Sequence, residues 1–140
     1  MSEKKLTLQD FNELNADNLM GHLGMKFTAV REGYAEATMP VVKHNTQMVG
    51  NLHGGASIAL AESLAGLGSL YLVYPDYGCV GMQISASHVS GGLMGETVVA
   101  KATILHQGGR THVWDVNIYS EEYGRLISTI KGTNAIVPRA

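Results

Sequence analysis

Cysteine is almost absent from this chain of 140 residues, which contains only Cys79. A lone cysteine forms no disulfide within the chain and cannot build a zinc site from several thiolates. This usage fits a reducing compartment, and we expect a cytoplasmic protein. The six histidines show neither HxH nor HxxxH spacing, so the sequence predicts no metal site.

Charge is also scarce. Charged residues make up 16% of the chain, and 10 Lys and Arg against 12 Asp and Glu give a formal net charge of −2. Basic residues are too few to follow a phosphate backbone, so we expect no nucleic-acid partner. Hydrophobic residues reach 45%, which is enough for a packed core, and the length fits one domain over residues 1–140.

Several functional signatures are missing as well. The chain has no GxxxxGK[ST] or GxGxxG phosphate-binding motif and no GxSxG elbow, which argues against a serine hydrolase. Its first ten residues lack the apolar segment of a signal peptide. One long apolar run covers residues 56–73, but Glu62 and three serines within it favour a core helix over a membrane span, and we expect no membrane association.

Periodicity and turn residues divide the rest of the chain. Thr7 is a predicted N-cap for a helix over residues 8–14, and a second turn covers residues 18–22. A loop over residues 41–52 leads to a long helix over residues 54–74. Strands are expected at residues 25–31, 33–39, 79–90, 96–107, 110–121 and 125–137. Because βαβ alternation is absent, the order predicts an α+β fold with an antiparallel six-stranded sheet and a helix on one face.

The long helix is apolar nearly all round, which is typical of a helix that is buried on every side. A six-stranded sheet covers only one side of a helix. The simplest cover for the other side is a second copy of the chain, so the composition predicts a homodimer.

The tripeptide His53-Gly54-Gly55 stands where this helix begins. Helix N-termini have unpaired N–H groups and a positive partial charge, and glycine lets a ligand approach them closely. The motif therefore predicts a site for an anion or a polarised carbonyl oxygen. The alternative is a purely structural role, in which the glycines make a tight helix entry and His53 is a polar cap.

Glu62 is the only formal charge in the apolar run. A buried carboxylate is costly unless it has a partner, and a structural ion pair is one explanation. No Lys or Arg lies three or four residues away in the helix, and Ala65 and Gly66 leave space beside the acid. This pattern favours a reacting group. Gly54 lies about 12 Å away along the same helix, so one carbonyl contacts both residues only if two protomers share the site.

Four segments together resemble the hotdog-fold acyl-CoA thioesterases, in particular the 4-hydroxybenzoyl-CoA and 1,4-dihydroxy-2-naphthoyl-CoA thioesterase branch. They are TQMVGNLHGGASIALAES, EATMPV, and the segments over residues 80–89 and 113–126. The resemblance implies a sheet wrapped around one central helix and hydrolysis of an aromatic acyl-CoA without a metal or redox cofactor. It also implies a dimer with shared sites, paired again into a tetramer.

The same resemblance implies roles for individual residues. Glu62 corresponds to the catalytic carboxylate, and Gly54 to the residue whose N–H holds the thioester oxygen. His53 corresponds to a histidine that orients the site or contacts the leaving sulfur, and Gln47 to a glutamine near the reacting water or carbonyl. The residues expected to contact substrate or coenzyme A are Gly66, Gly81, His88, Ser90, Gly108, Gly109 and Arg110.

Two positions depart from the family pattern. Gly66 stands where the branch often has Ser or Thr, and Ser90 stands where an Arg often contacts the nucleotide. Coenzyme A binding is therefore expected to depend more on Gly108, Gly109 and Arg110, although Arg110 is equally compatible with a solvated turn charge.

Two other functions stay open at this point. One is a non-catalytic acyl-CoA-binding module, and the other is a hotdog dehydratase, whose sequence settings differ from HGG followed by LAES. Of the remaining side chains, Trp114 and the methionines are expected in the core.

Overall fold

The structure is a computed structural model that describes residues 5–139. Its elements are α1 (Leu8–Leu14), α2 (Leu19–His22), β1 (Lys26–Arg31), β2 (Tyr34–Pro40), the 3-10 helix η1 (Lys43–Asn45), α3 (Gly54–Val73), β3 (Tyr77–His88), β4 (Thr97–Gln107), β5 (Thr111–Ser120) and β6 (Leu126–Pro138). All predicted helices and strands are present, with ends shifted by two residues or fewer. The predicted domain of residues 1–140 includes residues 1–4 and 140, which lie outside the described residues, and its extent stays a prediction.

The start of α1 is fixed by the predicted cap. The Thr7 hydroxyl oxygen accepts a hydrogen bond from the Asp10 N–H at 3.2 Å, and the Asp10 carboxylate accepts one from the Thr7 N–H at 2.8 Å. This reciprocal pair satisfies two N–H groups that the helix leaves free. The helix that follows places Phe11 in the core.

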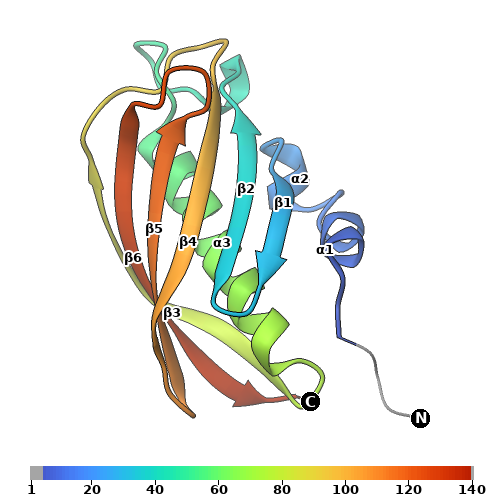
Figure 1. Cartoon of the computed structure of the whole chain (residues 1–140). Coiled ribbons are helices and arrows are strands. Elements are labelled where there is room, and N and C mark those ends of the chain that lie inside the picture. The colour runs from blue at the N-terminus through green and yellow to red at the C-terminus, as the bar shows by residue number, and fades with distance from the viewer. Residues whose placement is uncertain (1–4, 140) are drawn as a thin grey trace.

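The six strands form one antiparallel sheet in the order β1-β2-β4-β5-β6-β3 (Figure 1). Strand β3 therefore lies at one edge and β1 at the other. Gly91 and Gly92 belong to the connection over residues 89–96. This connection passes over one end of the sheet and forms no hairpin, because β3 pairs with β6 whereas β4 pairs with β2 and β5. This crossing brings the connection next to the start of α3.

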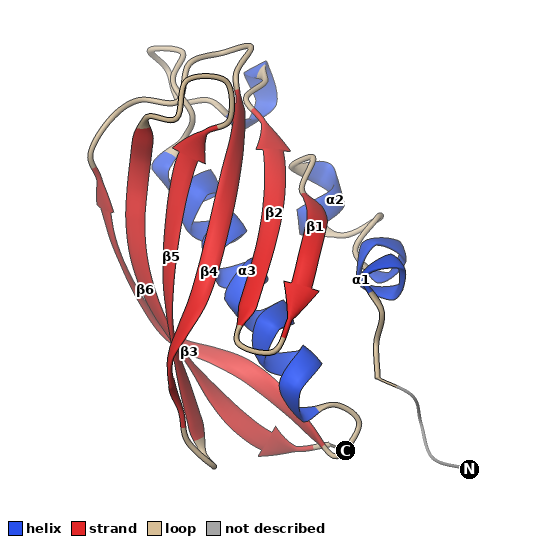
Figure 2. Ribbon diagram, in the orientation of Figure 1, coloured by secondary structure: helices blue, strands red, loops and turns tan. Residues whose placement is uncertain are grey.

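Helix α3 lies against the concave face of the sheet, as Figure 2 shows. Its buried residues are Ala56, Ser57, Leu60, Ala61, Leu64, Ala65, Leu67, Gly68 and Ser69. The helix is long and apolar enough to cross a membrane, but half of that apolar stretch is buried inside the fold. The sheet covers one side of α3, as predicted, and the remaining residues of the helix are partly buried or exposed in the single chain. That a second copy of the chain covers this other side stays a prediction.

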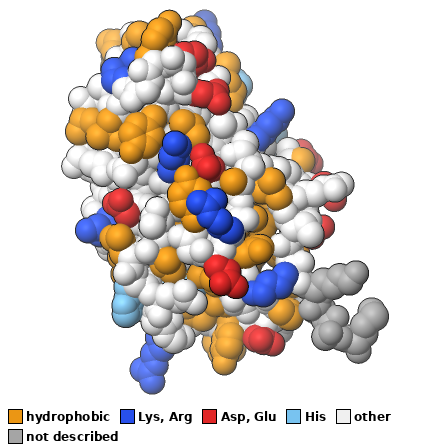
Figure 3. Space-filling view, viewed as in Figure 1, with side chains coloured by type: hydrophobic (Ala, Val, Ile, Leu, Met, Phe, Trp, Pro, Cys, Tyr) orange, Lys and Arg blue, Asp and Glu red, His pale blue; other side chains and the backbone are white. Residues whose placement is uncertain are grey.

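The strands alternate as the period-2 pattern predicts. In β2, Ala35, Ala37 and Met39 are buried against α3, whereas the residues between them are only partly buried. The outer face seen in Figure 3 carries positive and negative side chains side by side among apolar ones. The inward alternation is what lets one face of the sheet cover the helix.

The core contains Trp114, which is fully buried as predicted. The expectation that the methionines are core residues is wrong for Met48, Met82 and Met94, which are all more than half exposed. Met48 and Met94 lie in connections, and Met82 lies at the bulge in edge strand β3, where no second layer covers them within the single chain.

A small polar cluster joins the C-terminal half of α3 to the sheet. The Ser69 hydroxyl lies 2.8 Å from Trp114 Nε1, 3.0 Å from Asn134 Nδ2 and 2.8 Å from His112 Nδ1. Burial, helped by His106, lowers the pKa of His112, so the neutral ring is favoured. Buried N–H groups on β5 and β6 find their acceptors on α3, and a shift of the helix would leave them without a partner. The cluster therefore fixes the position of α3 on these two strands.

Two glycines of α3 test this packing. A Cβ at Gly68 would lie 2.5 Å from Trp114 Cη2, whereas a Cβ at Gly66 would meet no atom within 4 Å. Gly68→Ala should therefore lower the free energy of unfolding by about 1–3 kcal/mol through overpacking. Gly66→Ala should raise it by up to about 1 kcal/mol through helix propensity. Urea unfolding of both variants measures the difference, and equal changes would contradict the packing.

Candidate active site

The start of α3 leaves one backbone donor free. His53 is the N-cap residue, and its Nδ1 accepts a hydrogen bond from the Gly55 N–H at 2.8 Å. The His53 carbonyl oxygen accepts from the N–H groups of Ala56 and Ser57 at 2.9 and 3.2 Å. His53 therefore caps the helix, which is the structural role that its position before Gly54 allows. Among residues 5–139 the Gly54 N–H has no acceptor, so it remains available to a ligand.

A pocket of about 220 Å³ opens in front of Gly54. It brings together four residues that the sequence singled out, namely Gln47, Gly54, His88 and Ser90. The Gln47 side-chain oxygen accepts from the Val49 N–H at 2.7 Å and, more weakly, from the Asn51 N–H at 3.3 Å. These bonds hold the turn before α3 and leave the Gln47 amide NH₂ as the group that can donate to a ligand.

His88 crosses closely over the helix start. A Cβ built at Gly54 would lie 2.7 Å from His88 Nε2, so only glycine fits at position 54 with this ring in place. The other ring nitrogen, Nδ1, lies 2.7 Å from the hydroxyl of the buried Ser128. Ser128 therefore orients the His88 ring, which lines the same pocket as Gly54.

Glu62 lies elsewhere on α3 and is exposed in the single chain. This corrects the expectation of a buried carboxylate. Among the described residues no Lys, Arg or His forms an ion pair with it, so the structural ion pair considered from the sequence is absent there. A Cβ at Gly81 would lie 2.7 Å from Glu62 Oε2, which shows that the carboxylate packs against the backbone of β3 at a position where a side chain would displace it.

An apolar pocket of about 260 Å³ borders the same turn of α3. Ser63 and Gly66 line it from the helix, together with Phe11, Asn15, Met20, Phe27, Leu67, Leu70 and Cys79. Burial raises the pKa of the Cys79 thiol, which donates to the Gly66 carbonyl oxygen at 3.3 Å. The thiol is therefore kept in its neutral form and is a poor nucleophile.

The predicted coenzyme-contacting hairpin forms but lies apart from the Gly54 pocket. Gly108 and Gly109 make the β4–β5 turn, and the Arg110 carbonyl oxygen accepts from the Ile136 N–H at 2.8 Å. Thr111 pairs with Ala135, which pairs with Val80, so the hairpin belongs to the Gly81 end of β3. Its side chains do not line the pocket at Gly54.

The single chain thus divides the predicted residues between two ends of β3. Gln47, His53, Gly54, His88 and Ser90 lie at one end, and Glu62, Gly66, Gly81 and the residues 108–110 lie toward the other. Sequence reasoning missed Asn51, Ser57 and Ser128. Ser57 could have been found because it lies one helical turn after Gly54, but Ser128 depends on the pairing of His88 with Ser128 across β3 and β6.

Within residues 5–139, no group of three or more His, Cys, Asp or Glu side chains is arranged to hold a metal ion. The Gly54 N–H can polarise the carbonyl group of a ligand, and the Glu62 carboxylate can accept a proton or act as a nucleophile.

The chain is similar in sequence to known proteins. The profile of the thioesterase superfamily matches residues 49–127. The 1,4-dihydroxy-2-naphthoyl-CoA hydrolase of Escherichia coli is 36% identical over 135 residues, which cover 96% of this chain and 98% of that enzyme. The proofreading thioesterase EntH of Cronobacter turicensis is 38% identical over 136 residues, covering 96% and 97% of the two chains.

Solved structures agree with the sequence matches. The crystal structure of a thioesterase from Haemophilus influenzae superposes with a TM-score of 0.89 at 33% identity and covers 96% of this chain and 93% of that one. The profile match covers more than half of the chain, including the start of α3, Glu62 and the pocket wall. The chain belongs to the thioesterase superfamily and is a thioester hydrolase with the hotdog fold.

Proposed function

We propose that the protein hydrolyses the thioester bond of an aromatic acyl-CoA to a free acid and coenzyme A. The observation that carries this proposal is the free Gly54 N–H at the N-terminus of a twenty-residue helix, facing a pocket lined by His88 and Gln47. A donor of this kind stabilises the negative charge that develops on a carbonyl oxygen during attack. The activity of the E. coli relative on an aromatic acyl-CoA supports the substrate class.

The site is completed by a second protomer. Strand β3 is twelve residues long, lies at the sheet edge, and exposes Tyr77, Val80 and Met82. A long apolar edge strand favours pairing with another strand. If two β3 strands pair antiparallel with Gly81 opposite the partner's His88, the two-fold axis passes near Ser85. Glu62, which lies against Gly81, then faces the partner's Gly54.

The reaction follows from these two groups. Acting as a base, the Glu62 carboxylate takes a proton from water while the water oxygen attacks the carbonyl carbon. The displaced electron pair moves to the carbonyl oxygen, which the Gly54 N–H of the partner holds. The C=O bond then re-forms, the C–S bond breaks, and the proton passes to the sulfur to give the thiol. Acting as a nucleophile, Glu62 would instead form an anhydride that water hydrolyses to the same products.

The acyl group is proposed to occupy the apolar pocket beside Glu62. Two aromatic side chains, Phe11 and Phe27, line this pocket, and Gly66 leaves its helical wall open. Aromatic rings pack well against such walls. The coenzyme arm then extends from the thioester away from the apolar pocket, through the polar pocket at Gly54.

Replacing the carboxylate tests the chemistry. Glu62→Gln keeps the size of the side chain but removes the base or nucleophile, so kcat for benzoyl-CoA should fall by about 10²–10⁴-fold. Thiol release measured with a chromogenic reagent reports the rate. Glu121 is an exposed carboxylate just after the end of β5, so Glu121→Gln is the matched control and should keep the wild-type kcat. Full activity of Glu62→Gln would refute the proposed role.

Mixed dimers test whether the site is shared. Gly54→Ala places a Cβ against His88, and Glu62→Ala removes the acid, so each variant alone should be inactive. A dimer with one chain of each kind contains one intact site, because one chain contributes Gly54 and the other Glu62. Co-expressed, differently tagged chains purified as mixed dimers should therefore recover about half of the wild-type activity per dimer. No recovery in folded mixed dimers would mean that each chain has its own site.

Cysteine cross-linking tests the strand pairing. Gln83, Ser85 and Ser87 are exposed on β3, and single cysteines at these positions sample three registers. Ser85→Cys should form the covalent dimer most readily, because directly opposed residues bring their Cβ atoms within about 4.5–5.5 Å. Non-reducing electrophoresis compares the three with the wild type, which retains Cys79, and with Thr103→Cys on β4. Cross-linking no greater than in these controls would exclude β3 pairing.

A further inference from the structure

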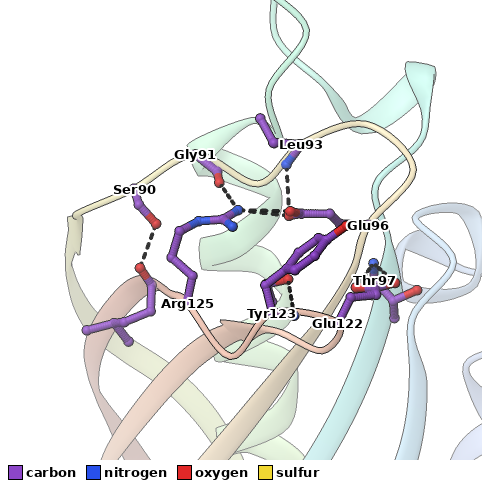
Figure 4. A network of polar contacts seen from close by, with 10 residues as sticks. Ser90, Gly91, Leu93, Glu96, Thr97, Glu122, Tyr123 and Arg125 are labelled. Carbon is purple, nitrogen blue, oxygen red and sulfur yellow. Dashed lines mark hydrogen bonds and ion pairs between the residues drawn. The ribbon is translucent and has the colours of Figure 1, made fainter.

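One wall of the Gly54 pocket is built by the connection that follows β3. Ser90 and Gly91 line the pocket opposite the helix start. Figure 4 shows that this connection is tied to the beginning of β6 by a network of polar contacts. The Ser90 hydroxyl donates to the Leu126 carbonyl oxygen at 2.6 Å, and the Arg125 guanidinium donates to the Gly91 carbonyl oxygen at 2.6 Å.

Glu96 is the other end of this network. Its side chain is only 6% exposed, and its carboxylate lies 2.9 and 3.1 Å from Arg125 Nη2. The same carboxylate accepts the Leu93 N–H at 3.1 Å. A carboxylate this well buried is stable only because these donors surround it. Arg125 and Glu96 together therefore hold the connection at two points, Gly91 and Leu93.

The connection over residues 89–96 packs against the residues that precede α3. A Cβ at Gly91 would lie 3.0 Å from Asn51 Nδ2, and a Cβ at Gly92 would lie 3.0 Å from Leu52 Cβ. The Gly92 carbonyl oxygen accepts the Leu52 N–H at 2.8 Å. The backbone of Gly91 and Gly92 is therefore packed closely against the residues just before His53 and Gly54. A shift of this wall would change the width of the pocket.

We propose that Arg125 and Glu96 are positioning residues that set the pocket wall for the coenzyme arm of the substrate. This inference rests on the proposed function, which directs that arm through the polar pocket. Neither side chain is among the residues that line the pocket, so both act through Ser90 and Gly91. The Gly54 donor and the acid are carried by α3, and within residues 5–139 neither side chain of the pair forms a hydrogen bond or ion pair with that helix.

The placement predicts a particular kinetic effect. When the pair is broken, the wall loses its two anchors while Gly54 and Glu62 keep theirs on α3. Coenzyme binding should weaken, whereas the chemical step in the bound complex should change little. A loss of general stability would have the opposite pattern, because it lowers the amount of active enzyme and hence the apparent kcat while leaving KM unchanged.

The test uses Glu96→Gln, Arg125→Gln and the double variant in the full chain. Glu122→Gln is the matched control: its carboxylate also accepts backbone N–H bonds at this end of the fold, from Thr97 at 3.0 Å, but it lies outside the pocket wall. KM and kcat are measured with benzoyl-CoA, and the Kd of free coenzyme A is measured by calorimetry. Thermal unfolding checks that each variant is folded at the assay temperature.

Each single variant should raise KM for benzoyl-CoA and Kd for coenzyme A about tenfold, with kcat within about threefold of wild type. The double variant should be no worse than the worse single one, because both changes release the same wall. Glu122→Gln should bind as the wild type does.

Three results would overturn the inference: unchanged coenzyme A binding in folded Glu96→Gln and Arg125→Gln, additive effects in the double variant, or an equal loss in Glu122→Gln. Failure of the proposed function would look different, because the wild type itself would then neither hydrolyse benzoyl-CoA nor bind coenzyme A.

Discussion

The contact between α3 and β3 is the constraint on which the rest of the structure depends. The helix begins against His88, and Glu62 lies against Gly81, so both ends of the candidate site are set by how one helix lies on one strand. A rigid helix keeps its first amide and its acid about 12 Å apart, and a single carbonyl cannot contact both. The strand that carries both contact points is also the open edge of the sheet. The fold therefore favours a site that two chains build together.

Much of this could be predicted from residue patterns. The helical period and Thr7 placed α1, alternation placed β2, and the apolar run ending at Pro75 placed α3. The free amide at Gly54 follows from a helix beginning at His53-Gly54-Gly55. The exposure of Glu62 could not be predicted, because it depends on which side of α3 the sheet covers. The strand order could not be predicted either, because six antiparallel strands can pair in many orders. The edge position of β3 depends on that order and was therefore also not predictable.

The two family departures take on a physical meaning in the fold. Gly66 has no neighbouring atom where a Cβ would stand, and it borders the apolar pocket, so its lack of a side chain enlarges the space beside Glu62. The Ser90 hydroxyl is bonded to the Leu126 carbonyl oxygen, so this position strengthens a wall and supplies no cation to the coenzyme. The candidate site is therefore apolar on the side of the acid and polar on the side of the amide, which matches an aromatic acyl group joined to a polar coenzyme.

The most direct test of this account is a crystal structure with an unreactive analogue, in which a methylene group separates an aromatic ketone from the coenzyme sulfur. In a shared site, the ketone oxygen lies about 3 Å from the Gly54 N–H of one protomer, and Glu62 of the other protomer faces the carbonyl carbon. The aromatic ring lies beside Gly66. An analogue bound within one chain, or with its carbonyl remote from Gly54, would contradict the account.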